Sequence, residues 1–324
     1  MKAAIVNSLT GPEDLSIGDL EIEEPGPGRL LIEVKYAGVN FPDILITQGK
    51  YQFQPDLPFA PGGEVAGVIK EVGPDVTDFK PGDRVVAGTT WGGFAEEALG
   101  FDFNTHHLPD EISFEDAAAI LMTHGTVIHA LRDRAALMKE ETLVVLGASG
   151  GVGTAAIQLG KIIGARVIAL TSSEEKVNYC LSAGANEAHT YTADNLKLLL
   201  KEITGGKGAD VIFDPIGSEY AEQAFRGIAP QGRYLVIGFA AGKVPSIPLN
   251  LPLLKSASIV GAFWGSFFRH FPNENRRNIS QLFDWIKQGE LRPIVDQVFP
   301  LEQTSKGIQK LQKRNVKGKV LIKV

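Results

Sequence analysis

Short runs that alternate apolar and polar residues fill the first hundred positions of the chain. In LLIEVKYAGV (30–39), Ile32, Val34 and Tyr36 alternate with charged residues. This two-residue period places successive side chains on opposite faces of a β-strand. Further short apolar runs, bounded by Gly, Pro and Asp, are EVAGVIKEVG (64–73) and GDRVVAG (82–88). The pattern predicts a barrel-like or sandwich-like β domain.

The pattern changes near residue 113. SFEDAAAILMTHGTVIHAL (113–131) is rich in Ala, begins with a cap-like Ser113 and has two acids in its first turn, which predicts a helix. Apolar strands and helices then alternate. The predicted strands are 142–147, 166–171, 189–191, 211–217, 232–238 and 258–264, and the predicted helices are 152–164 and 173–184. Apolar strands separated by helices predict a doubly wound parallel sheet.

The last sixty residues do not continue this alternation. A helical pattern surrounds ISQLFDWIKQG (279–289), and the chain finishes with the apolar run KVLIKV (319–324). We expect this final strand to return to the first domain, which would make that domain discontinuous.

Composition narrows the class of protein. The chain has 324 residues, of which 44% are hydrophobic and 22% charged, as in globular proteins with a sizeable core. A net charge of −6 and the lack of a dense Lys/Arg stripe argue against a nucleic-acid partner. The single cysteine, Cys180, excludes an intrachain disulfide and a thiolate-rich metal site. No apolar stretch reaches the length of a membrane helix, and the first apolar run is too short for a signal peptide. We therefore expect a cytoplasmic protein, with an organellar location after removal of a transit peptide as the alternative.

A glycine-rich turn lies between the predicted strand 142–147 and the predicted helix 152–164. In GASGGVG (147–153), Gly150 and Gly153 keep the second and third places of the pattern G-x-G-x-x-G, and Ala148 holds the first. Free backbone N–H groups and the helix dipole at such a turn bind a dinucleotide pyrophosphate, and glycine lets the backbone approach it. A purely structural turn is the alternative. The context of strand, turn and helix favours the cofactor.

The end of the next predicted strand indicates which nicotinamide cofactor binds. It reads Leu170-Thr171-Ser172-Ser173 and lacks the acid that holds the ribose 2′-hydroxyl of NAD. Lys176 follows within a turn, whereas the neighbouring Glu174 and Glu175 occupy the first helical turn, where acids are common. A neutral strand end with a nearby cation suits the 2′-phosphate of NADPH. The alternative for Lys176 is a solvated surface lysine.

Over essentially its whole length the sequence resembles the medium-chain dehydrogenase/reductase superfamily, and within it the zinc-independent, zeta-crystallin-like quinone oxidoreductases. The matching segments are GVNFPDILITQGKY (38–51), LPFAPGGEVAGVI (57–69), VGPDVTDFKPGDRVVA (72–87), GASGGVG (147–153) and GKVLIKV (318–324). The resemblance implies an α/β protein with a GroES-like β-barrel catalytic domain over 1–118, completed by 265–324. It also implies a Rossmann domain over 119–264 with a doubly wound parallel sheet, an active site in the cleft between the domains, and a homodimer.

The resemblance further implies that no metal binds. Zinc-dependent relatives have Gly-His-Glu where this chain has Gly62-Gly63-Glu64, and a cysteine ligand where it has Asn40. Glu64 is then expected to be structural and to accept hydrogen bonds. The histidines do not restore a site, because His106 and His107 would face opposite sides of a strand, and His124 and His129 are five residues apart.

Carried over position by position, the resemblance also implies a cofactor and substrate site. Asn40 and Tyr51 correspond to the substrate pocket and are the expected catalytic residues, with packing as the alternative for Tyr51. For the nearby Asp43, a hydrogen bond within the same loop and a turn role are equally open. Positions corresponding to cofactor contacts are Ser172, Lys176 and Tyr191 at the 2′-phosphate, Gly150, Gly151 and Val152 at the pyrophosphate turn, and Thr126, Phe239 and Phe263 around the nicotinamide. Ser149 and Gly217 are expected to contact the cofactor as well.

These features predict NADPH-dependent hydride transfer to a quinone. Without a metal, nothing strongly polarises an alcohol for oxidation, which favours reduction of acceptors that are already electrophilic. The nearest alternative is reduction of an enone or an enoyl thioester on the same scaffold. A nucleotide-binding protein with a structural or RNA-binding role is a further alternative, and the acidic net charge argues against it.

Overall fold

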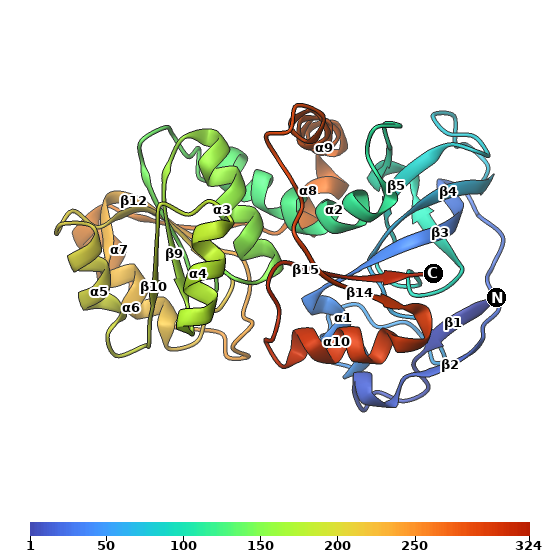
Figure 1. Ribbon diagram of the computed structural model, residues 1–324, viewed down its shortest axis with the longest axis horizontal. Helices are drawn as coiled ribbons and strands as arrows, with labels where there is room; N and C mark the ends of the chain where they lie inside the picture. Colours follow the sequence, from blue (N-terminus) through green and yellow to red (C-terminus); the bar gives the residue numbers. More distant parts are fainter. The chain divides into compact units, whose positions relative to one another are not determined.

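The computed structural model describes all residues, Met1–Val324, and divides them into two compact units (Figure 1). We call Met1–Met122 together with Gly265–Val324 unit 1, and Thr123–Trp264 unit 2. No helix in either unit is both long enough and apolar enough to cross a bilayer.

Unit 2 is built on a six-stranded sheet in which every neighbouring pair of strands is parallel. In spatial order the strands are β10 (Glu187–Thr190), β9 (Arg166–Thr171), β8 (Thr142–Val145), β11 (Ala209–Asp214), β12 (Ile228–Val236) and β13 (Ser258–Gly261). The first strand in sequence, β8, is central, and the chain adds strands outward on both sides of it. The predicted doubly wound parallel sheet is confirmed.

Helices between these strands cover the sheet, and they bury it because the strands are apolar on both faces. They are α3 (Gly151–Ile163), α4 (Glu174–Ser182), α5 (Leu196–Ile203), α6 (Tyr220–Arg226) and α7 (Asn250–Lys255). Val144 and Ile168 from the sheet pack with Leu200 and Phe225 from the helices, and all four are fully buried.

Unit 1 contains a seven-stranded sheet and a separate two-stranded one. The small sheet pairs β1 (Lys2–Ile5) with β2 (Ser16–Asp19). The large one follows the order β14 (Val295–Pro300), β15 (Lys319–Lys323), β3 (Arg29–Val39), β4 (Glu64–Val72), β5 (Arg84–Gly88) and β7 (Thr105–His107), with β6 (Glu97–Phe101) beside the first half of β3. The last strand, β15, thus lies between β14 and β3.

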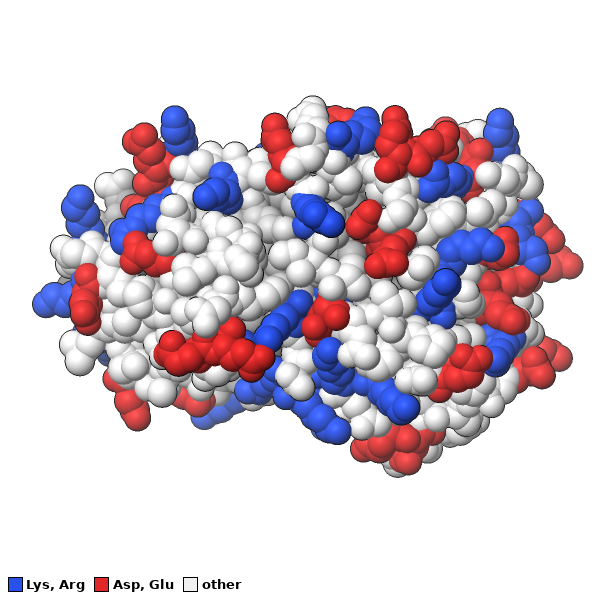
Figure 2. All heavy atoms as spheres, in the orientation of Figure 1, with Lys and Arg blue, Asp and Glu red and all other residues white.

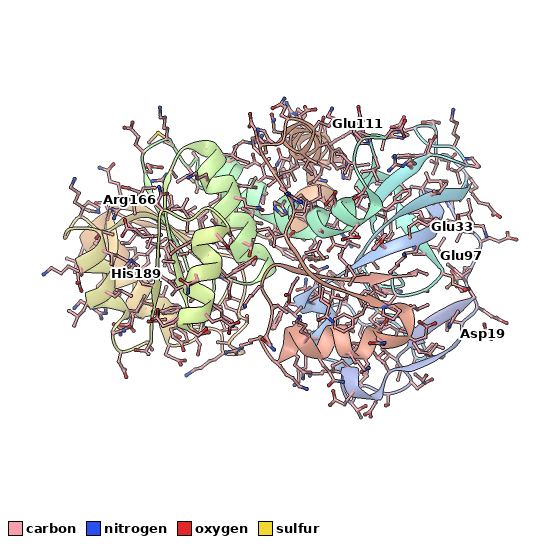
Figure 3. The ribbon with its side chains drawn as sticks, in the orientation of Figure 1. Asp19, Glu33, Glu97, Glu111, Arg166 and His189 are labelled. Carbon is pink, nitrogen blue, oxygen red and sulfur yellow. The ribbon has the colours of Figure 1, made fainter.

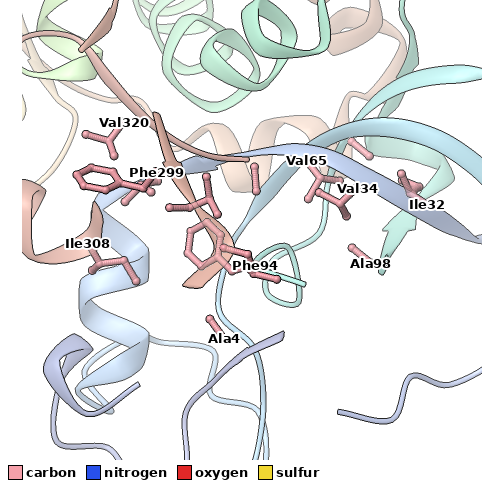
Figure 4. Packing of buried hydrophobic residues seen from close by; sticks show 14 of the residues in the cluster. Ala4, Ile32, Val34, Val65, Phe94, Ala98, Phe299, Ile308 and Val320 are labelled. Carbon is pink, nitrogen blue, oxygen red and sulfur yellow. The ribbon is translucent and has the colours of Figure 1, made fainter. Parts of the chain in front are cut away.

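Side chains from both segments of unit 1 form one core. Ile32 and Val65 from β3 and β4 lie in the same cluster as Phe299 and Val320 from β14 and β15 (Figure 4). Helices of this unit are α1 (Phe41–Thr47), α2 (Phe114–Ile128), whose last residues belong to unit 2, α8 (Trp264–His270), α9 (Pro272–Lys287) and α10 (Thr304–Gln312).

Two predicted helices differ from the observed ones by more than two residues at one end. The helix expected at 113–131 begins as predicted, with the Ser113 hydroxyl accepting from Asp116 N at 3.0 Å, but its α-helical part ends at Ile128 and continues as a π-helix, His129–Arg134. The helix expected around 279–289 begins earlier, at Pro272. The sequence pattern did not show this start, because the first turns of the helix are polar and have no apolar period. Helices α1, α8 and α10 of unit 1 were not predicted.

Candidate functional site

The carboxyl ends of all six parallel strands of unit 2 lie at the same end of its sheet, and the cofactor candidates follow them. Ser149 comes after β8, Ser172 after β9, Tyr191 after β10, Gly217 after β11, Phe239 after β12 and Phe263 after β13. The amino ends carry ion pairs instead, such as that between Arg166 (labelled in Figure 3) and Glu187. From β8 the strand order runs to β9 and β10 on one side and to β11, β12 and β13 on the other, and ligands of open α/β sheets bind at such a switch point.

The turn after β8 has the features of an anion site. Gly150 is the N-cap of α3, and no side chain caps the N–H groups of the first turn. A Cβ at Gly153 would lie 2.5 Å from the Gly147 carbonyl oxygen, so the turn itself requires that glycine. A Cβ at Gly150 would meet only that same oxygen, at 3.6 Å, so the space in front of it is open. Free N–H donors at a helix N-terminus with open space before them fit a pyrophosphate.

The candidates for the 2′-phosphate come from neighbouring strand ends. Ser172 is exposed, and Lys176 lies in the first turns of α4. Tyr191 is half-buried against Tyr220, with the ring centroids 5.4 Å apart. An acid also lies here, because Glu174 accepts a hydrogen bond of 3.3 Å from Thr190 Oγ1. The sequence reasoning placed this acid in the helix only, and the structure connects it to the end of β10.

Two of the remaining candidates of unit 2, Gly217 and Phe239, approach each other, and the other two, Thr126 and Phe263, are sequence neighbours of a contacting pair. A Cβ at Gly217, whose φ is +69°, would lie 2.8 Å from a ring carbon of Phe239, so the turns after β11 and β12 touch. Thr126 is half-buried on α2, and its neighbour Gly125 packs against Trp264, the residue after the exposed Phe263.

Asp214 and Tyr234 form a buried pair that supports the turn at Gly217, and the sequence pattern did not indicate it. Asp214 accepts hydrogen bonds from Ile216 N at 2.7 Å and Gly217 N at 3.0 Å, and the Tyr234 hydroxyl donates to its other oxygen. Burial raises the pKa of Asp214, and burial beside Asp214 raises that of Tyr234. No local pattern distinguishes Asp214 from an ordinary residue at a strand end.

In unit 1, a buried ion pair fixes the loop that carries the substrate candidates. Glu64 opens β4 and is 0% exposed, and Lys319 opens β15 with 4% of its side chain exposed. Lys319 Nζ donates to Glu64 Oε1 and, at 2.6 Å, to Asn40 Oδ1. Glu64 Oε2 accepts from Met122 N at 2.7 Å. Glu64 therefore accepts hydrogen bonds, as expected, and its cationic partner comes from the last strand of the chain.

All hydrogen-bonding groups of the Asn40 side chain are used within the protein. Its Nδ2 donates to Glu64 Oε1 at 2.7 Å and to the Gly38 carbonyl at 3.1 Å, while its Oδ1 accepts from Lys319. The two N–H bonds of an amide are then both occupied. Asn40 has no donor left for an acceptor oxygen, so its geometry supports a positioning role rather than the predicted contact with substrate.

Asp43 completes this loop as part of the N-terminal cap of α1. Its carboxylate accepts from Asn40 N at 2.7 Å and from Gly62 N at 3.1 Å. Full burial raises the pKa of Asp43 to about 7, against the lowering effect of the bond from Asn40 N. Of the two roles that the sequence left open for Asp43, the hydrogen bond within the same loop is present, as the bond from Asn40 N.

Tyr51 is the substrate candidate whose polar group is free. Its ring is half-buried and meets Phe53 edge-on at 6.0 Å, and its hydroxyl has no hydrogen bond within the protein. Burial raises the pKa of Tyr51, Asp43 raises it further, and Arg269 lowers it. The phenol is therefore protonated at neutral pH and available as a donor.

No three His, Cys, Asp or Glu side chains lie close enough together to hold a metal. His106 is buried beside Asn275, and burial lowers its pKa to about 3, while its neighbour His107 faces outward and stacks on Phe79. His124 and His129 hydrogen-bond to Gln158 and Asp133 at 3.1 Å each. The structure thus gives each of these histidines a packing or hydrogen-bonding partner.

The parallel sheet, its glycine turn and the strand ends define a dinucleotide-binding class of protein. Two family models match the chain: zinc-binding dehydrogenase over residues 151–287, and alcohol dehydrogenase GroES-like domain over residues 26–110. Quinone oxidoreductase-like protein 2 of Bos taurus is 35% identical over 99% of this chain and 92% of its own length. The chain belongs to the medium-chain dehydrogenase/reductase superfamily, in its quinone oxidoreductase branch, and the predicted fold class is confirmed.

Solved structures agree with this assignment. Escherichia coli quinone oxidoreductase complexed with NADPH superimposes with a TM-score of 0.93 at 29% identity, covering 100% of both chains. A mycobacterial protein complexed with NADPH gives 0.93 at 30% identity, again over 100% of both chains. The chain is therefore an oxidoreductase of the medium-chain type.

Proposed function

We propose that the protein uses NADPH to reduce a quinone by hydride transfer. The observation that carries this proposal is the open glycine turn after β8, with uncapped N–H groups and a cofactor candidate after each of the other five strands at the same end of the sheet. The two similar structures that contain NADPH support the choice of cofactor. The quinone oxidoreductase relatives support the choice of acceptor.

The residues of unit 2 fit the parts of this cofactor. The N–H groups of Gly151 and Val152, with Ser149 and Gly150 beside them, would hold the pyrophosphate. Ser172, Lys176 and Tyr191 would hold the 2′-phosphate. The nicotinamide would lie against the candidates Thr126, Gly217, Phe239 and Phe263, and when bound it supplies the hydride.

In unit 1, the roles divide between a free phenol and a fixed loop. Tyr51 would donate a hydrogen bond to the acceptor oxygen and stabilise the negative charge that develops there. Lys319, Glu64 and Asn40 would hold the loop in place without touching the acceptor. An enone or enoyl thioester is the second candidate acceptor, because the free Tyr51 hydroxyl suits a carbonyl oxygen equally well.

The experiment is an assay of NADPH consumption with a panel of quinones, enones and enoyl thioesters, for the wild type and Tyr51→Phe. We expect quinones to give the highest kcat/KM. Tyr51→Phe should lower kcat about 10- to 100-fold with an enone and less with a quinone, whose reduced oxygen can take a proton from water. NADPH affinity should remain unchanged. Unchanged kcat on every accepted substrate would leave Tyr51 with a packing role only, and failure to consume NADPH with any acceptor would refute the proposed function.

We also propose that two copies associate through unit 2. Strand β13 is the last strand of its sheet, and its outer edge has no partner strand. Exposed apolar side chains accompany this strand and α7, namely Leu249, Leu253, Leu254 and Ile259. An unpaired strand edge can pair with its own copy about a two-fold axis.

Sedimentation velocity tests this association. The wild type should sediment as a dimer, and Leu253→Glu with Leu254→Glu should shift it to monomer. Leu198→Glu is the matched control, because Leu198 is also exposed in unit 2 but lies on α5. A monomeric wild type, or a double variant that stays dimeric, would refute the proposed interface.

A further inference from the structure

Arg269, on α8 in unit 1, has no carboxylate partner, unlike several other arginines of the chain. Arg84, Arg166 and Arg233 each form an ion pair with a carboxylate. Arg269 is exposed and forms no hydrogen bond and no ion pair. Its five N–H donors are therefore available to a ligand.

Aromatic rings hold this guanidinium in place. Its central carbon lies 5.6 Å from the ring centroid of Phe53 and 6.0 Å from that of Phe268. Phe268 stacks on Phe103, with the centroids 6.1 Å apart. Arginine contacts with ring faces leave the N–H donors at the edge of the guanidinium plane unobstructed. Arg269 is thus a positioned cation with unused donors.

The same group lies beside the free phenol of the substrate candidate. Phe53 contacts Arg269 on one side and Tyr51 edge-on at 6.0 Å. The positive charge of Arg269 lowers the pKa of Tyr51, in opposition to burial and to Asp43. The exposed ring of Phe53, which is 42% accessible, offers an apolar surface between the two polar groups.

We infer that Arg269, Phe53 and Tyr51 form a recognition site for planar acceptors that carry a carboxylate or sulfonate. The Phe53 ring contacts the acceptor plane, Tyr51 binds the carbonyl oxygen, and Arg269 binds the anionic substituent through two parallel N–H bonds. This inference rests on the proposed function and names a substrate class for it. Arg269 is then a specificity-determining residue.

The test compares acceptors that differ only in the anionic group. Benzalacetone is compared with its para-carboxylate, and a naphthoquinone with its sulfonate, for the wild type, Arg269→Gln and Arg269→Lys. We expect Arg269→Gln to lower kcat/KM for the anionic acceptors about 10-fold, the lower part of the range for a charge-assisted pair because Arg269 is exposed. The neutral acceptors should change less than about threefold. Arg269→Lys should recover only part of the loss, because lysine cannot form the paired bonds.

Arg277→Gln is the matched control. It removes the same charge from an exposed arginine on α9, where Arg277 pairs with Glu274 at 3.2 Å. This variant should keep the wild-type ratio between anionic and neutral acceptors. An equal loss in Arg269→Gln and Arg277→Gln would show a general effect of charge and would overturn the inference.

Two further measurements separate this inference from the proposed function. Calorimetric binding of the para-carboxylate to the wild type and Arg269→Gln compares affinities without turnover, so it decides the inference even if no acceptor is reduced. Equal affinities would overturn it. An increase in the KM for NADPH of Arg269→Gln with every acceptor would also overturn the inference, because Arg269 would then bind a cofactor phosphate.

Discussion

The buried pair of Lys319 and Glu64 gives the sharpest prediction about stability. Lys319→Met keeps most of the apolar stem and removes the charge, which leaves the Glu64 carboxylate buried with two uncharged donors, Asn40 Nδ2 and Met122 N, at 2.7 Å each. It also removes the 2.6 Å bond to Asn40 Oδ1. Breaking a buried pair on one side costs about 3–5 kcal/mol. We expect a loss of about 4 kcal/mol in the free energy of unfolding, because the two remaining donors stabilise the carboxylate only in part.

Adding Glu64→Gln to Lys319→Met should restore part of this loss. The double variant has no buried charge in the pair, and neutral replacements of a buried ion pair are tolerated far better than half of the pair. We expect it to be about 2 kcal/mol more stable than Lys319→Met alone. Lys35→Met is the control, because Lys35 pairs with Glu33 on the exposed side of the neighbouring strand β3, and it should change stability little.

Urea unfolding measures these differences from the midpoint and the slope. Two of the three tryptophans, Trp91 and Trp285, belong to unit 1, and Trp264 is the last residue of unit 2, so fluorescence reports mainly on the part of the chain that contains the pair. Coincident fluorescence and circular dichroism transitions are the criterion for a two-state analysis. A loss below about 1 kcal/mol in Lys319→Met, or a double variant less stable than Lys319→Met, would refute the reasoning.

Three further predictions concern the cofactor, pH and metal. Lys176→Ala should weaken NADPH binding by roughly 1.5–3 kcal/mol and leave NADH nearly unchanged in a fluorescence titration, and an equal effect on both would show that Lys176 does not bind the 2′-phosphate. The pKa of His106 falls to about 3 on folding, so as the pH is lowered the unfolded chain takes up this proton before the folded chain does. The contribution of neutral His106 to the free energy of unfolding should therefore be fully present above about pH 6.5 and be lost as the pH falls toward 3. Acid titrations of unfolding should show a shallower decline in His106→Asn, and identical slopes would contradict this. Elemental analysis should find far less than one zinc per chain, since the family resemblance implies that Asn40 and Gly63 replace zinc ligands and no three His, Cys, Asp or Glu side chains lie close enough together to hold a metal. Stoichiometric zinc linked to activity would contradict this prediction.

The alternation of strands and helices in unit 2 could be predicted because the apolar runs and turn residues that define each element lie close together in the sequence. Strand β9 was predicted at 166–171, which are its bounds in the structure, and α3 was predicted within one residue at each end. A buried parallel strand is a continuous apolar run with a turn at each end, so nearby residues define it. The glycine turn was found for the same reason.

The contacts that decide the roles in unit 1 could not be predicted in this way. Lys319 and Glu64 are 255 residues apart, and neither stretch of sequence identifies the other as its partner. Asn40 was expected to bind substrate, yet its use of both N–H bonds depends on Glu64 and on the backbone of Gly38. The free guanidinium of Arg269 is defined by the absence of an acid around it, which only the folded chain shows.

The position of Lys319 also affects how the chain folds during synthesis. Unit 2 is one continuous segment, whereas unit 1 needs β14 and β15 from the end of the chain. At about 5–20 residues per second, a ribosome needs roughly 10–50 s to reach Lys319 after Glu64, since 255 residues separate them. During that interval the Glu64 carboxylate lacks its cationic partner Lys319, and the edge of β3 that later pairs with β15 has no neighbouring strand. Unit 2 can therefore complete its fold while the first segment of unit 1 still lacks the two strands that finish its sheet.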